Sequence, residues 1–207
     1  PITTTSDLGE ALSGADAILV AVPSHGFRSV MEAVPPISLS TPILSLTKGI
    51  EQGSGLRMTE VIREVLPTHD AAKIGVLTGP NLAKEIMNGE PAATVIAIRD
   101  PVAGADLQQA LMTPRFRVYT NNDVAGSELC GALKNVMAIA AGMIGGLGLG
   151  FNTTGMFLTR ALAEMTRLGI RLGSSPLTFG GLAGVGDLVA TCMSPLSRNH
   201  TVGTKLG

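Results

Sequence analysis

Three charged residues stand in stretches of this sequence that are otherwise small and apolar: Lys134 in GALKNV, Asp187 in GLAGVGDLVATC and Arg198 in SRN. Isolated charges are costly to bury, so charges on apolar backgrounds indicate a polar site rather than a core. Burial lowers the pKa of a lysine, and a carboxylate partner raises it again. A Lys–Asp pair is therefore a proton donor and acceptor whose pKa its surroundings can adjust.

Lys134 has small neighbours at helical spacing, which would let another backbone or a ligand approach it closely: Cys130, Gly131, Ala138 and Ala141. The alternative interpretation is a lysine that extends to the surface from a helix face. The small neighbours and the adjacent Asn135 favour the site.

The elements that must position these residues fall into two parts. The first 121 residues alternate between amphipathic runs and short apolar runs, which predicts a doubly wound, mostly parallel α/β sheet. We predict strands within 16–23 and over 42–47, 73–78, 92–98 and 116–120, and helices within 3–15 and over 26–34, 55–66, 81–88 and 101–111.

Three loops after the predicted strands carry groups that could bind a ligand: VPSHGF, LTKGIE and LTGPNLAKE. Ligands of such sheets bind beyond the carboxyl ends of the strands. Lys48 would project from one strand end, Gly79 would shape a turn, and Asn81 could cap the next helix. Phe27 is expected to be exposed and able to stack on a flat ring. Each loop alone could be an ordinary turn, but together they indicate a binding crevice.

After Asn122 the strand-like runs stop and helical runs begin, over 124–149, 153–172, 186–193 and 199–206. We therefore predict an α/β domain over 1–121 and an all-helical domain over 122–207.

Composition excludes several classes of function. The net charge is -1 and no basic run is present, which argues against nucleic acid as a partner. The two cysteines lack metal-ligand spacing, so we expect reduced thiols and no metal site. The apolar run 136–149 is shorter than the roughly 20 residues of a membrane span, so we expect a cytoplasmic protein. Charged residues make up only 15% of the chain, which suggests surface buried against a second copy, as in a homodimer.

The ordered set VPSH-x-F, TKGIE, TGPNLAKE, ELCGALKNV, GLAGVGDL-x-x-TC and SRN resembles the bacterial type of NAD(P)-dependent glycerol-3-phosphate dehydrogenase over essentially the whole chain. The resemblance implies a partial Rossmann domain that binds NAD(P)H, followed by a helical catalytic domain. It also implies reversible reduction of dihydroxyacetone phosphate to sn-glycerol 3-phosphate for glycerophospholipid synthesis.

The resemblance implies a role for each matching residue. Lys134 would be the catalytic proton donor and acceptor, Asp187 would orient it, and Lys48 would be a second positive group near the substrate. The implied substrate contacts are Lys48, Gly79, Asn81, Lys134, Asn135, Asp187, Thr191, Ser197, Arg198 and Asn199. The implied cofactor contacts are Phe27, Lys48, Ala83 and Arg198. Asn81 departs from the family pattern, since many relatives have serine there.

The family's glycine-rich loop would lie before residue 1 and a further segment after Gly207, so we expect these 207 residues alone to be nearly inactive. Two alternatives stay open. One is another reductase with Rossmann and helical domains, such as a ketopantoate or imine reductase. The other is a non-catalytic fragment that retains only the packing surface of the helical domain.

Overall fold

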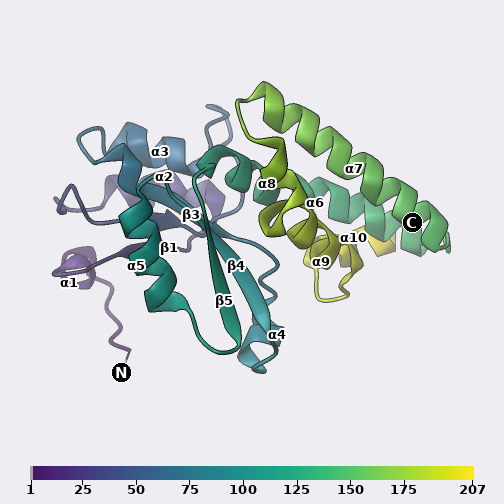
Figure 1. The fold of residues 1–207 in the computed structure, drawn as a ribbon, viewed down its shortest axis with the longest axis horizontal. Coiled ribbons are helices and arrows are strands. Elements are labelled where there is room, and N and C mark those ends of the chain that lie inside the picture. The colour runs from purple at the N-terminus through teal and green to yellow at the C-terminus, as the bar shows by residue number, and fades with distance from the viewer. Residues whose placement is uncertain (1) are drawn as a thin grey trace.

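The computed structural model describes residues 2–207, in which a five-stranded sheet precedes a group of helices (Figure 1). The strands follow one another across the sheet in sequence order. They are β1 Ile18–Val20, β2 Ile43–Ser45, β3 Ile74–Thr78, β4 Ala92–Ala97 and β5 Phe116–Asn121. The prediction of alternating strands and helices over this part is confirmed, although β1 and β2 are shorter than their apolar runs.

The sheet is mixed, because β3 and β4 pair antiparallel while the other three pairings are parallel. An apolar run buried on both faces reads the same in either direction, so the sequence did not reveal this reversal. The connection between the two strands holds only the short helix α4 (Ala83–Met87), which lies at the end of the strands (Figure 1). A parallel pair needs a helix that crosses the sheet face instead.

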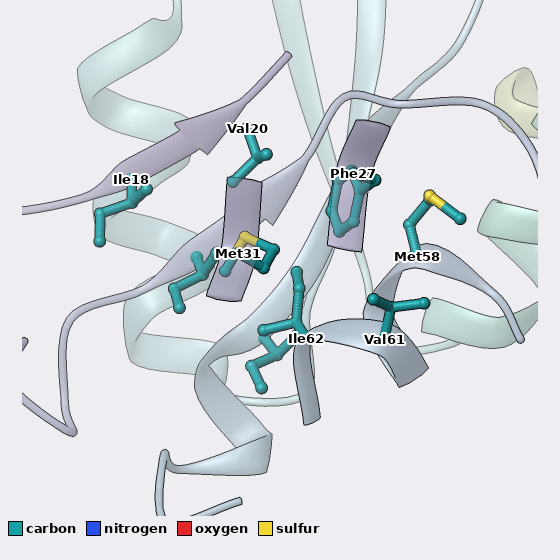
Figure 2. Close-up of a cluster of buried hydrophobic side chains, with 9 residues drawn as sticks. Ile18, Val20, Phe27, Met31, Met58, Val61 and Ile62 are labelled. Atoms are coloured by element: carbon teal, nitrogen blue, oxygen red, sulfur yellow. The ribbon is translucent and has the colours of Figure 1, made fainter. Parts of the chain in front are cut away.

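Helices cover both faces of the sheet, as the doubly wound prediction requires. On one face, α2 (Phe27–Glu32) and α3 (Met58–Val65) pack on the strands through a cluster that includes Phe27, Met31 and Ile62 (Figure 2). On the other face, α5 (Pro101–Leu111) packs on a second cluster. Adjacent residues of β2 show the alternation, because Ile43 belongs to the first cluster and Leu44 to the second. The short α1 (Leu8–Leu12) precedes β1.

The predicted helical part is also present. It comprises α6 Val124–Gly146, α7 Phe151–Arg171, α8 Pro176–Gly180, α9 Asp187–Met193 and α10 Arg198–Leu206. Two elements were not predicted from the sequence: α8 and a π-helical turn, Leu182–Gly186, that leads directly into α9. Glycines in GLAGVG hid the helical signal there. The turn sets the direction in which α9 presents its first residue, Asp187.

Helix α6 is the central helix of this part. It packs against α7, α9 and α10, and glycines allow the closest of these contacts, because a Cβ on Gly142 or Gly203 would overlap the backbone of the facing helix. By length and composition alone α6 could cross a membrane, so the short-run argument from the sequence does not hold. Its buried charges, Glu128 and Lys134, and its three packed neighbours make it a core helix.

Candidate active site

Lys134 lies in the middle of α6 with only 7% of its surface exposed. Its ammonium group donates to Asp187 Oδ1 at 2.6 Å and to Thr191 Oγ1 at 2.5 Å. Asp187 begins α9 and Thr191 follows one turn later, so both side chains lie on the same face of that helix. The structure therefore joins the lysine, the aspartate and the threonine that the sequence analysis singled out.

A second ammonium group reaches the same carboxylate from the α/β part of the chain. Lys48, in the loop after β2, donates to Asp187 Oδ2 at 2.7 Å and to the carbonyl oxygen of Gly79 at 3.1 Å. Gly131 on α6 makes room for it, since a Cβ there would lie 3.3 Å from Lys48 Cγ. The small residue that the sequence analysis noted beside Lys134 thus admits the second lysine.

The charges of this site change the pKa of Lys134. Burial, together with the nearby positive charge of Lys48, lowers the pKa of Lys134 to about 8, although Asp187 acts in the opposite direction. Two ammonium groups share one carboxylate, so the site carries one excess positive charge at neutral pH. Such a site favours an anionic ligand or an oxygen that becomes negative.

The turn after β3 holds the next group of predicted residues. Gly79 has a φ of 142°, a backbone conformation that favours glycine, and its carbonyl accepts from Lys48. The Asn81 amide nitrogen donates to Thr94 Oγ1 at 2.9 Å, and Thr94 Oγ1 donates to the carbonyl of Thr78 at 3.0 Å. Because the Thr94 proton is committed, Asn81 must donate its nitrogen, which leaves its Oδ1 free as an acceptor.

The start of α10 holds the SRN residues. Ser197 is buried and caps the helix by accepting from the backbone of His200. Arg198 is exposed, so its guanidinium is accessible to an anion. Asn199 donates to Asn135 Oδ1 at 2.9 Å, which ties the start of α10 to the residue next to Lys134.

The structure corrects one of the sequence predictions. Phe27 was expected to be exposed and to stack on a flat ring, but its side chain is fully buried in the core beneath α2 (Figure 2). The ring packs against the apolar surface of the sheet, so neither ring face is available to a ligand. Ala83 is exposed at the start of α4, and its proposed cofactor contact stays a prediction.

Glu128 and Thr94 were not predicted from the sequence as part of the site. Glu128 is a further charge in the apolar stretch of α6, only 4% exposed, and the same reasoning that found Lys134 could have found it. Thr94 lies within an ordinary strand pattern and gave no signal. Among residues 2–207, no three metal-binding side chains lie together. Burial raises the pKa of Cys130 to about 12 and that of Cys192 to about 11, so both thiols stay protonated at neutral pH.

Comparison with known proteins identifies the family. The family model described as NAD-dependent glycerol-3-phosphate dehydrogenase N-terminus matches residues 1–103, and the model described as the C-terminus of the same family matches residues 123–207. The chain belongs to this family. It is 55% identical over 204 residues to glycerol-3-phosphate dehydrogenase [NAD(P)+] 2 of Sphingopyxis alaskensis, a match that covers 98% of the chain and 60% of the relative.

Solved structures of glycerol-3-phosphate dehydrogenases have the same fold. The structure from Coxiella burnetii is 39% identical, with a TM-score of 0.87, over 97% of this chain and 61% of that one. The yeast enzyme is 28% identical, with a TM-score of 0.83, over 98% and 60%. The chain thus spans about 60% of the length of the relatives it matches.

The residues present fit a polar group of the NAD(P) cofactor that this dehydrogenase family uses. In sheets of this kind ligands bind beyond the carboxyl ends of the strands, and β2 and β3 end close to Lys48 and Gly79. Two buried oxygens at this place, Thr78 Oγ1 and Asn81 Oδ1, have no hydrogen-bond partner among residues 2–207. Buried polar atoms left unpaired in a ligand-free protein are suited to a polar ligand.

Proposed function

We propose that the whole protein reduces dihydroxyacetone phosphate to sn-glycerol 3-phosphate with NAD(P)H, in a reversible hydride transfer that feeds glycerophospholipid synthesis. The observation that carries the proposal is the Asp187 carboxylate held between the ammonium groups of Lys134 and Lys48, at 2.6 and 2.7 Å, in a chain of this family. Residues 1–121 would form part of the cofactor-binding domain, and residues 122–207 part of the catalytic domain.

Lys134 supplies the proton in this proposal. In the direction of reduction its ammonium group gives a proton to the carbonyl oxygen as that oxygen gains negative charge, and the neutral amine takes a proton back in the reverse direction. A pKa of about 8 suits both directions, since each form of the lysine is well populated near neutral pH. Asp187 holds the ammonium group in place and keeps it from shifting further toward the neutral form.

Lys48 supplies a charge that does not depend on that proton. When Lys134 has given up its proton, Lys48 and Asp187 remain as a hydrogen-bonded ion pair, so the site stays electrically balanced. Lys48 also holds the Gly79 carbonyl, which keeps the turn with Asn81 beside the reacting groups.

The phosphate end of the substrate would lie at the start of α10. Arg198 presents a planar, permanently charged group of the kind that binds phosphate through two parallel hydrogen bonds. Ser197, Asn199, Thr191 and Asn135 complete the proposed substrate contacts around it. These five residues lie on α6, on α9 and at or just before the start of α10, so the packing of the helical part determines the shape of this end.

When bound, NAD(P)H supplies the hydride for the carbonyl carbon. Lys48, Ala83 and Arg198 are the residues of this chain proposed to contact it. Phe27 has no ring face free for such a contact. The cytoplasmic location and the homodimer remain part of the proposal.

The test uses the full-length protein that the gene encodes, called here the full encoded chain. It measures the oxidation of NADPH, and separately of NADH, from the fall in absorbance. Rapid oxidation with dihydroxyacetone phosphate, and little with unphosphorylated dihydroxyacetone, supports the proposal. Oxidation only with another keto acid would contradict the substrate. A protein that binds glycerol 3-phosphate without turnover of either cofactor would contradict the reaction and favour the non-catalytic alternative.

A further inference from the structure

Helix α6 carries a buried carboxylate that the reaction does not use. Glu128 is 4% exposed and lies six residues before Lys134, on the same helix. Its Oε1 accepts from the backbone nitrogen of Thr59 at 2.9 Å, and its Oε2 accepts from the Thr59 hydroxyl at 2.7 Å. Arg57 Nη1 lies 3.7 Å from Oε2. Burial raises the pKa of Glu128, while these donors act against that shift.

The partners of Glu128 stand at the N-terminus of α3, where free backbone N–H groups and the helix dipole favour a negative charge. A carboxylate from the helical part thus docks on a helix of the α/β part. Removal of one partner from a buried, hydrogen-bonded charge is costly, so this contact holds α6 and α3 in one fixed relation.

The same helix terminus is joined to Lys48. Residues 48–57 form a short return loop, closed by the antiparallel bridge between Ile50 and Arg57 and by the Glu51 nitrogen donating to the Leu56 carbonyl at 2.8 Å. One end of this loop is Lys48, and the other leads into α3 at the place that Glu128 holds. The loop therefore transmits the position of α3 to Lys48.

A second ion pair keeps the loop from moving independently of the helices. Arg28 of α2 donates to both carboxylate oxygens of Glu51 at 2.9 Å and to Glu64 of α3 at 3.0 Å. The loop is therefore attached to α2 and α3 as a unit. The hydrogen bonds of Glu128 to Thr59 join this unit to α6 and so fix its position relative to that helix.

We propose that Glu128 is a positioning residue that fixes the placement of Lys48 relative to Lys134, and so sets the charge arrangement around Asp187. Its carboxylate acts through α3 and the loop 48–57, and it touches neither substrate nor cofactor. The significance for the reaction rests on the proposed function, but the placement of Lys48 can be measured without it.

The test is the pKa of Lys134, followed by NMR of ¹³C-labelled lysine ε-methylene groups in the full encoded chain. In E128A the hydrogen bonds between residue 128 and Thr59 are lost and Lys48 moves away from Lys134. The pKa of Lys134 therefore rises by at least about half a unit. The same substitution lowers kcat for dihydroxyacetone phosphate at least about tenfold. If E128A does not fold, T59V removes one donor from the same contact and gives a smaller shift in the same direction.

Two comparisons separate this role from general stabilisation. Asp100 also caps a helix, by accepting from the backbone of Val102 and Ala103, but at α5; D100A therefore lowers stability without moving the pKa of Lys134. In a K48M background, E128A produces no further shift, because the group through which Glu128 acts is gone. An unchanged pKa of Lys134 in folded E128A or T59V, or an equal shift with and without Lys48, would overturn the proposal. If the wild type does not act on dihydroxyacetone phosphate, the proposed function is contradicted, but the titration still tests the placement of Lys48.

Discussion

The charge on Lys48 should control the proton affinity of Lys134, and the substitution Lys48→Met tests this directly. Both ammonium nitrogens contact one carboxylate, at 2.6 and 2.7 Å, so they lie no more than roughly 8 Å apart. At that separation two unit charges repel by about 2 kcal/mol if the effective dielectric constant is about 20. At roughly 1.4 kcal/mol per unit, removal of one charge raises the pKa of the other group by about 1.5 units.

We therefore expect the pKa of Lys134 to rise from about 8 to roughly 9.5 in K48M. The ε-methylene signals of Lys48 and Lys134 can each be assigned by a single substitution in the full encoded chain, and no ligand is needed for the titration. The control is K73M, which removes the same charge from the far end of β3, where Lys73 pairs with Asp100.

In K73M we expect no change in the pKa of Lys134. If the pKa of Lys134 stays the same or falls in K48M, the account of this site is wrong. Such a result would mean that burial alone lowers the pKa and that Lys48 does not contribute.

Three further predictions concern the same site and its support. In D187N the two ammonium groups lose their shared anion, so the pKa of Lys134 measured by NMR falls below 8. The free energy of unfolding, measured by urea denaturation, falls by about 3 to 5 kcal/mol. An unchanged free energy of unfolding would contradict the buried ion pair. G203A forces α10 away from the Ile139 carbonyl and lowers the free energy of unfolding by roughly 1 to 3 kcal/mol, whereas G145A, which meets open space, raises it by up to about 1 kcal/mol. Reduction needs protonated Lys134, so the reduction rate of the full encoded chain falls as pH rises through about 8, while the oxidation rate rises over the same range. If both rates change with pH in the same direction, Lys134 is not the titrating group.

Local signals were sufficient to predict most elements of the fold. The helix Pro101–Leu111 has the predicted bounds, because Asp100 caps it and Pro101 suits its first turn. The direction of β4 could not be predicted, since it depends on where the chain returns after α4. The α8 helix and the following π-helical turn were missed because their glycines weaken every helical pattern, and tertiary packing decides their conformation.

The candidate site was predictable where a charge stands out from its surroundings. Lys134 and Asp187 lie in apolar segments 53 residues apart, and the cost of burying either one alone implied a partner. Phe27 was misjudged because a lone aromatic near a loop carries no sign of which way its ring points. Thr94 was missed because its role exists only through Asn81 and Thr78, which the sheet brings together.

The central claim is that Lys134 donates the proton, and the most direct test is kcat of Lys134→Met in the full encoded chain with dihydroxyacetone phosphate and saturating NAD(P)H. Loss of a general acid predicts a fall of about a hundredfold to ten-thousandfold, with the cofactor dissociation constant unchanged. The matched control, K205M, replaces an exposed lysine near the end of α10 and should retain full activity. A kcat for K134M within a few-fold of the wild type would contradict the account.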